Sequence, residues 1–99
     1  MELTKKDLFN AKNSSKQLED GLMLKVLAVA TMQDTDKDGD IIEVGVLKTE
    51  DGIYSTISAT VINSLDMLSD IIADDGEVDV AVRVGTSKSG RDFFMLEII

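Results

Sequence analysis

Apolar and polar positions alternate most regularly in residues 78–99. Four valines, which share one face of a predicted strand, occupy every second position: Val78, Val80, Val82 and Val84. Period-two alternation is typical of a strand with one buried face. Residues 85–90 are small and polar and predict a turn. A second strand then places Phe94, Leu96 and Ile98 opposite the valines, and turns Phe93, Met95 and Glu97 to the other face.

Three earlier strands and one long helix follow from the same kind of pattern. Strands are predicted over residues 22–32, 41–47 and 53–57, with connections at residues 34–40 and through the pair Asp51-Gly52. The helix is predicted from an apolar stripe at helical spacing, formed by Val61, Leu65, Leu68 and Ile72 and widened by Ile62 and Ile71. Ser58 or Thr60 is suited to cap its start, and Gly76 to end it.

The first 21 residues are polar and mixed. Thr4 and Asp7 have the spacing of a capping box, with Leu3 and Leu8 placed as a hydrophobic staple. A short helix over residues 5–11 is predicted, and an extended segment through Leu8 and Phe9 is the alternative. Residues 13–16 are expected to form a loop and residues 19–21 a turn.

The order strand, strand, strand, helix, strand, strand predicts the fold. A single helix between strands three and four of five is the arrangement of the OB-fold, a small Greek-key barrel. The chain is therefore expected to be mainly β, with a five-stranded OB-fold-like barrel over residues 22–99. Residues 1–21 are expected to pack on the barrel or flank it. A chain of 99 residues fits one such domain.

Composition removes most kinds of chemistry. The chain has no Cys and no His, which excludes disulfides, zinc sites built on these residues and any nucleophile paired with a histidine. No constellation for carboxylate, Lys or Tyr catalysis is evident, so we expect no enzyme, no cofactor and no metal. The absence of an apolar run of membrane-spanning length and of a signal peptide predicts a cytoplasmic protein.

The net charge is −9, from 10 basic and 19 acidic residues. Binding to nucleic acid needs cations against phosphates, so a nucleic-acid-binding protein of this composition must gather its cations on one face. The alternative is that the acidity is itself the function, as in an inhibitor that imitates DNA and binds a host DNA-processing protein.

Two aromatic rings are candidates for stacking on bases. Strand parity makes Phe94 a core residue and leaves Phe93 exposed, while Tyr54 shares its strand face with Thr56 and Ser58. Stacked rings beside a basic groove are how single-stranded nucleic acid is held. The nearby cations of the predicted surface are Lys25, Arg83, Lys88 and Arg91. The alternative is that both rings cover the mouth of the barrel or pack under the N-terminal segment.

Two loops also resemble binding sites. Residues 34–41 match the first eight positions of an EF-hand loop, but Gly45 stands where the bidentate Glu belongs and the flanks are strands. We therefore favour a hairpin loop, with a weak cation site as the alternative. The loop at residues 85–90 could place amides and Lys88 against a phosphate; the alternative is an ordinary hairpin tip.

Two segments resemble a known family. The stretches D-G-I-Y-S-T-I-S-A-T-V (residues 51–61) and V-G-T-S-K-S-G-R-D-F-F-M-L (residues 84–96) resemble the small single-stranded DNA-binding proteins of protein-primed Bacillus phages. The pieces L-F-N-A and L-E-D-G of the first 21 residues resemble its N-terminal part. The resemblance implies a replication protein that coats and protects the displaced strand. It also implies a tyrosine contact at Tyr54. The chain departs from the family in residues 28–40, which lack aromatic residues.

The predicted function is therefore sequence-independent binding of single-stranded DNA in phage replication, in the host cytoplasm. Tyr54 and Phe93 are expected to stack on bases. The expected phosphate contacts are Lys25, Arg83, Lys88 and Arg91, with Lys12 and Lys16 from the N-terminal segment. Single-stranded DNA is the expected partner, and self-association of copies along the strand is left open.

Overall fold

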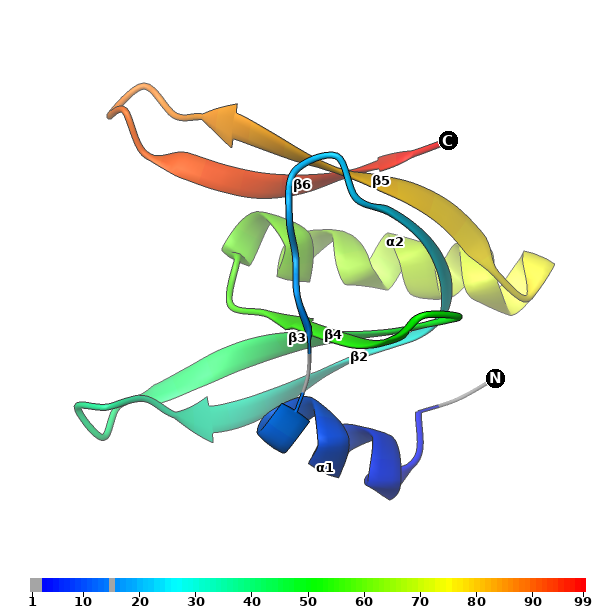
Figure 1. Cartoon of the computed structure of the whole chain (residues 1–99), viewed down its shortest axis with the longest axis horizontal. Coiled ribbons are helices and arrows are strands. Elements are labelled where there is room, and N and C mark those ends of the chain that lie inside the picture. The colour runs from blue at the N-terminus through cyan, green and yellow to red at the C-terminus, as the bar shows by residue number, and fades with distance from the viewer. Residues whose placement is uncertain (1–2, 15) are drawn as a thin grey trace.

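A computed structural model describes residues 3–14 and 16–99, without the side chains of residues 12–14. Two helices and six strands follow one another along the chain (Figure 1). Their order is α1 (Lys5–Ser14), β1 (Lys16–Gln17), β2 (Met23–Thr35), β3 (Ile41–Thr49), β4 (Gly52–Thr56), α2 (Ala59–Asp75), β5 (Val78–Thr86) and β6 (Asp92–Ile98).

The strands form one curled sheet in the order β1-β4-β3-β2-β5-β6. All neighbours are antiparallel except β1, which pairs with β4 in parallel through Lys16 and Tyr54. The sheet is a half-barrel, and its single central helix lies between β4 and β5, so the predicted OB-fold-like architecture is confirmed. The strand count differs from the prediction. The sixth strand, β1, is two residues long and begins within the segment expected to be a loop. It forms by pairing with the edge of β4, a contact that the local sequence does not indicate.

The concave face of the sheet is closed by α2. Its buried residues are those of the predicted stripe: Val61, Leu65, Leu68 and Ile72. They pack against fully buried side chains of the strands, among them Leu47 and Val80. The helix begins after Ser58, whose side chain makes no capping hydrogen bond, and ends at Gly76. Gly76 has a φ of 82°, a conformation that glycine adopts without steric cost, and its N–H donates to the Ile72 carbonyl at 2.7 Å.

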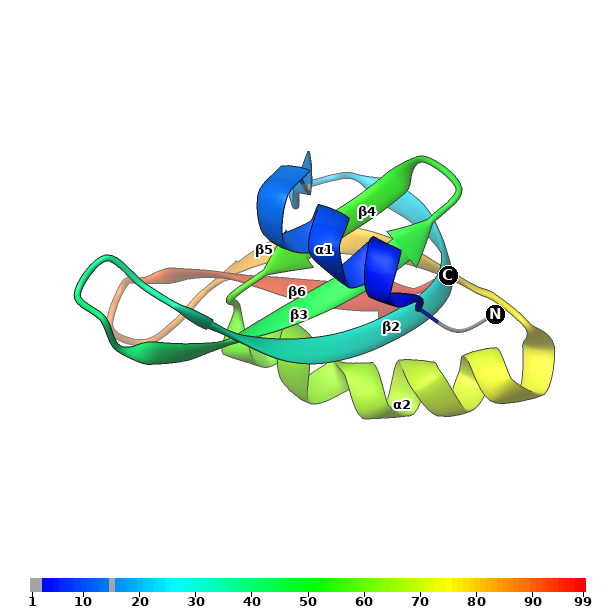
Figure 2. The ribbon, with the colours of Figure 1, turned by 90° about the horizontal axis from the view of Figure 1, so that it is seen from below.

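The convex face of the same strands is covered by α1. Val44 and Val46 of β3 pack against Ala11, and Leu3 and Leu8 join this second cluster. Figure 2 shows α1 and α2 on opposite sides of β2 and β3. Strand β3 is therefore buried on both faces, with Val46 and Leu47 both at 0% exposure. The predicted helix at the N-terminus is confirmed, and it extends to Ser14, beyond the predicted end.

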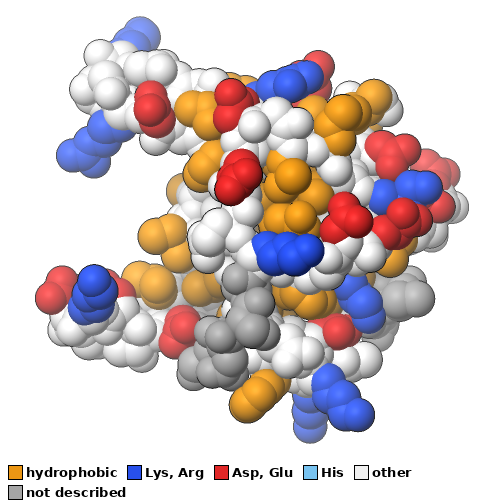
Figure 3. Space-filling model, viewed as in Figure 1, with side chains coloured by type: hydrophobic (Ala, Val, Ile, Leu, Met, Phe, Trp, Pro, Cys, Tyr) orange, Lys and Arg blue, Asp and Glu red, His pale blue; other side chains and the backbone are white. Residues whose placement is uncertain are grey.

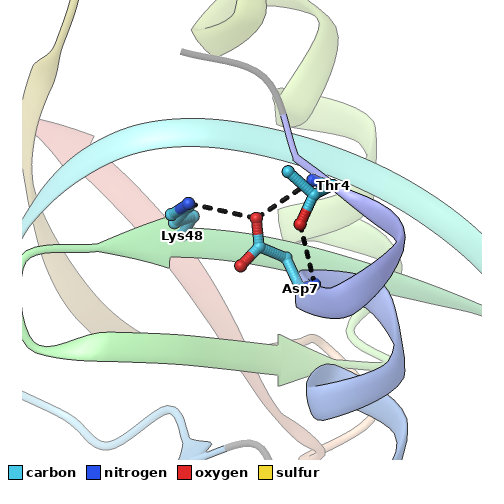
Figure 4. Close-up of polar contacts among 3 residues, drawn as sticks. All are labelled: Thr4, Asp7 and Lys48. Carbon is cyan, nitrogen blue, oxygen red and sulfur yellow. Dashed lines mark hydrogen bonds and ion pairs between the residues drawn. The ribbon is translucent and has the colours of Figure 1, made fainter.

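The capping box fixes the start of α1 (Figure 4). The Thr4 amide donates to Oδ2 of Asp7 at 3.0 Å, and the Asp7 amide donates to Oγ1 of Thr4 at 3.2 Å. Lys48 of β3 donates from Nζ to the same carboxylate at 3.0 Å, which ties the helix to the sheet. The Thr4 amide, and then the Lys48 ammonium, hold the pKa of Asp7 below the ordinary 3.8.

Two long hairpins project beyond the sheet on the same side (Figure 1). One is β2–β3, in which β2 runs to Thr35, three residues past the predicted end, because it stays paired with β3 as far as Ile41. The other is β5–β6. Its register pairs Val84 with Phe94 and Val82 with Leu96, as the alternation predicted.

The Asp7 carboxylate gives α1 a testable pH dependence. Because the pKa of Asp7 is lowered by folding, its contribution to stability is present above pH 3.8 and is lost as the pH falls below that value. We expect wild type to exceed Asp7→Asn in free energy of unfolding at pH 6, and the difference to shrink towards pH 3. Urea unfolding at several pH values measures it. In a Lys48→Met background the difference should be smaller at pH 6; an unchanged difference would contradict the contact with Lys48.

Candidate nucleic-acid interface

The β5–β6 hairpin carries an aromatic ring laid across a glycine. Phe93 and Gly85 are cross-strand partners. A Cβ added to Gly85 would lie 2.7 Å from Cζ of Phe93 and 2.6 Å from Cε of Met95. Both side chains therefore occupy space that only glycine leaves open. The prediction that Phe93 is exposed needs correction, since the ring is half-buried through this packing. One side of the ring is occupied by the hairpin.

The tip of this hairpin is a tight turn with two exposed cations, Lys88 and Arg91. The Ser87 amide donates to the Arg91 carbonyl at 2.8 Å, and the Gly90 amide donates to the Ser87 carbonyl at 2.9 Å. Oγ of Ser87 accepts from the Arg91 amide at 3.2 Å. Within the described part of the chain, neither cation pairs with a carboxylate. The turn thus holds two positive charges that lie five and two residues before Phe93 in the chain.

Arg83 lies on the same hairpin face, since its cross-strand partner is Met95. Its Nε donates to Oε2 of Glu97 at 3.2 Å, with both side chains more than half exposed. Exposed ion pairs of this kind are weak. A phosphate can compete with the Glu97 carboxylate for Arg83, so this residue is a conditional member of the site.

Tyr54 does not present a ring to the surface. Its exposure is 5%, and it belongs to the core cluster closed by α2. Lys16 lies over the ring at 5.8 Å from its centroid. The expectation that this ring is exposed is therefore wrong, and a stacking contact at Tyr54 stays a prediction. The neighbouring Ser55 and Thr56, at 8% and 9% exposure, are also buried. The polar residues of this strand therefore did not indicate a solvent-exposed face.

The other predicted cations do not gather at the hairpin. Lys25 pairs with Glu77 at 3.1 Å and with Glu50 at 3.7 Å. The hydrogen bond to Glu77, with the charges of Glu77 and Glu50, raises the pKa of Lys25 above 10.5. Lys16 lies on β1, at the other edge of the sheet order, and donates to the Asp51 carbonyl at 2.7 Å. The side chain of Lys12 lies outside the described residues.

A recess between β3 and the start of α2 was not found from the sequence. It has a volume of about 410 Å³ and is lined by Ile42, Glu43, Ile57, Ala59, Ile62 and Asn63. Ile57 is 69% exposed. Ser58, the next residue, donates from Oγ to the Phe94 carbonyl at 3.3 Å, which brings β6 beside the recess. Figure 3 shows a notch between the two hairpins with hydrophobic side chains on its walls, basic side chains at both hairpin tips, and acidic side chains beside the basic one at the β2–β3 tip. Ile57 ends a predicted strand, so parity gave no sign of its exposure.

The β2–β3 tip differs in charge from the β5–β6 tip. Lys37 stands there among four aspartates at residues 34–40. Oδ1 of Asp36 accepts from the amides of Asp38 and Asp40, both at 2.9 Å, which is the turn chemistry expected of a hairpin loop. Among the described residues, no group of three or more acidic side chains is placed to hold a metal ion.

A curled OB-fold-like half-barrel with a ring and cations on one projecting hairpin defines a class of protein, the β proteins that bind nucleic acid through sheet surfaces and hairpins. The family model described as phage single-stranded DNA-binding protein matches residues 3–99. The chain therefore belongs to this family, which is non-catalytic and binds single-stranded DNA in phage replication. The resemblance noted in the sequence is thereby confirmed. No curated protein and no solved structure matches the chain. No helix in the described residues is long and apolar enough to cross a membrane.

The burial of Tyr54 can be tested directly. The chain has one tyrosine and no tryptophan, so its tyrosine fluorescence reports this ring alone. Because the ring is 5% exposed, acrylamide should quench the folded protein several-fold less than the urea-unfolded protein. Equal Stern–Volmer constants in the two states would contradict the placement of Tyr54 in the core.

Proposed function

We propose that single-stranded DNA binds across the β5–β6 hairpin, without regard to sequence, with Phe93 against a base and Lys88 and Arg91 against phosphates. The observation that carries this proposal is the ring packed on Gly85, on the hairpin whose tip has two cations that pair with no carboxylate among the described residues. Every base has an apolar face, so a flat ring accepts any sequence. Packing on the glycine fixes the ring before DNA arrives, which reduces the ordering that binding requires.

The recess supplies apolar surface next to this hairpin. Ile57 and Ile42 line it, and Val84, which is 38% exposed, pairs with Phe94 on the hairpin face that continues the core. Aliphatic side chains cannot hydrogen-bond to base edges, so they offer contact without selecting a base. A strand held by the hairpin tip could thus lay neighbouring bases into the recess while its backbone stays near Lys88 and Arg91.

The charge of the rest of the molecule favours the same hairpin. The β2–β3 tip has four aspartates against one lysine, and α2 has four exposed aspartates in a chain of net charge −9. These surfaces repel phosphate. The strand is therefore directed to the β5–β6 side, and affinity should fall steeply with salt. Lys16, on β1, is a secondary candidate, which a strand would reach only by continuing to the other edge of the sheet. Lys12 is a further candidate from the N-terminal segment. Host cytoplasm is the proposed location, because phage DNA is replicated there.

An acidic inhibitor that imitates DNA is the rival function suggested by the charge alone. Such a protein would present its carboxylates in a row and would gain nothing from an open ring beside unpaired cations. The family membership favours DNA binding instead. The two functions separate in one experiment, because the inhibitor would not shift a labelled oligo-dT in a gel at low salt.

Phe93 should contribute directly to DNA affinity. We expect Phe93→Ala to weaken binding of a short oligo-dT by about 1–3 kcal/mol, the usual value of one stacked base. Gly85→Ala should weaken it by a smaller amount, because the new Cβ displaces the ring and the end of Met95 without removing them. Titration with labelled oligonucleotide measures both. Phe9→Ala, which removes an exposed ring on α1, is the matched control and should leave this affinity unchanged. Full affinity in Phe93→Ala would exclude the stacking contact.

Lys88 and Arg91 should account for part of the salt dependence. A contact with one phosphate of a single strand contributes about 0.7 to the slope of log K against log salt. Replacing both residues by alanine should therefore reduce the magnitude of the slope by about 1.4. Lys37→Ala, at the tip of the acidic hairpin, is the control and should leave the slope near its wild-type value. Equal slopes in the double variant and wild type would place the phosphates elsewhere.

A further inference from the structure

The outward face of α1 is basic and apolar. Phe9 is 68% exposed, and Lys5 and Lys6 lie one turn before it on the same exposed side. The opposite face of the helix is committed to the sheet through Leu8 and Ala11. The DNA-binding hairpin does not include these residues. The exposed Phe9 ring and the two lysines before it therefore lie outside the site described above.

The outward face of α2 has the complementary character. Met67 is 66% exposed, with Asp66 beside it and Asp70 one turn later. These residues lie opposite the buried stripe that faces the core. Thioether sulfur makes favourable contacts with aromatic rings, and carboxylates pair with ammonium groups. Each helix thus presents one large apolar side chain flanked by charges, and the two charge signs are opposite.

The two faces cannot meet within one molecule, because α1 and α2 cover opposite sides of the sheet (Figure 2). We propose that α1 of one copy docks on α2 of a second copy, with Phe9 against Met67 and Lys5 and Lys6 against Asp66 and Asp70. Such a contact joins two different surfaces, so each copy keeps one of each free for the next neighbour. The result is an open row of copies, which suits neighbours bound along one strand.

The net charge makes this contact selective. Two copies of charge −9 repel each other in most orientations. The repulsion is screened beyond about 8–10 Å at ordinary ionic strength, so the electrostatic interaction between two copies is decided by the charges in direct contact. Of the two helices in the described part of the chain, α2 contains no lysine or arginine, so α1 is the one that offers cations to the carboxylates of α2. The contact is expected to be weak in free protein and to become effective when DNA brings copies together.

Charge reversal tests the contact on both partners. One variant carries Lys5→Glu and Lys6→Glu, and the other carries Asp66→Lys and Asp70→Lys. Each variant alone should lose cooperative binding to a long oligo-dT, because both helices then carry the same sign. An equimolar mixture should recover cooperativity, because each variant complements the other. Sedimentation velocity of the DNA-free proteins at high concentration should show the same loss and recovery.

Short oligonucleotides distinguish a failure of the docking proposal from a failure of the proposed DNA binding, on which the measurement of cooperativity rests. Lys5→Glu/Lys6→Glu should bind an oligo-dT that holds one copy within about twofold of wild type. Loss of that affinity would make α1 a DNA contact and overturn the docking proposal. Cooperativity that is equal in wild type and both variants, or that is not recovered in the mixture, would also overturn it. A failure of all forms to bind DNA would instead remove the proposed function, and sedimentation would still decide the docking.

Discussion

The need to bury β3 on both faces determines how the rest of the molecule is arranged. Val46 points to one side and Leu47 to the other, and neither is exposed. A strand of this kind needs two covers. The inner cover is α2, whose apolar stripe closes the core, and the outer cover is α1, held by Asp7 and Lys48. With both helices engaged on the body of the sheet, the outer ends of the hairpins remain uncovered and become the surfaces available to a ligand.

The second determinant of where DNA can bind is the small number of described cations that neither pair with a carboxylate nor donate to a backbone carbonyl. Lys48, Lys25 and Arg83 pair with carboxylates, and Lys16 donates to a backbone carbonyl. The remaining described cations are exposed on three surfaces, which are the start of α1, the acidic β2–β3 tip and the β5–β6 tip. The start of α1 and the β5–β6 tip each have two cations near a ring, but among the described residues only the Phe93 ring of the β5–β6 hairpin is packed against a glycine. An acidic protein can therefore bind DNA by concentrating a small number of charges where the carboxylates are sparse. This also explains why the net charge alone was a poor guide to function.

Alternation and helical spacing predicted the elements whose two faces differ clearly in polarity. The β5–β6 register, the stripe of α2 and the Thr4–Asp7 capping box were all readable from residue types.

The predictions that were wrong or missing share one cause, which is that they depend on tertiary contacts. Strand parity tells which residues share a face, but β4 has polar residues on both faces, so it could not tell which face is buried. Tyr54 is inside because α2 covers that face. Which carboxylate reaches Lys25 depends on strands distant in sequence, and the exposure of Ile57 and Phe9 depends on where the helices dock. The short β1 required a tertiary partner that no local pattern announces.

The central claim is that DNA lies on the β5–β6 hairpin, and photocrosslinking tests it most directly. Oligo-dT with photoreactive thymine analogues would be bound at low salt, irradiated and digested, and the attached peptides identified by mass spectrometry. Binding on the hairpin predicts attachment within residues 83–94, centred on Phe93. Attachment confined to α1, to the β2–β3 tip or to the segment around Tyr54 would contradict it.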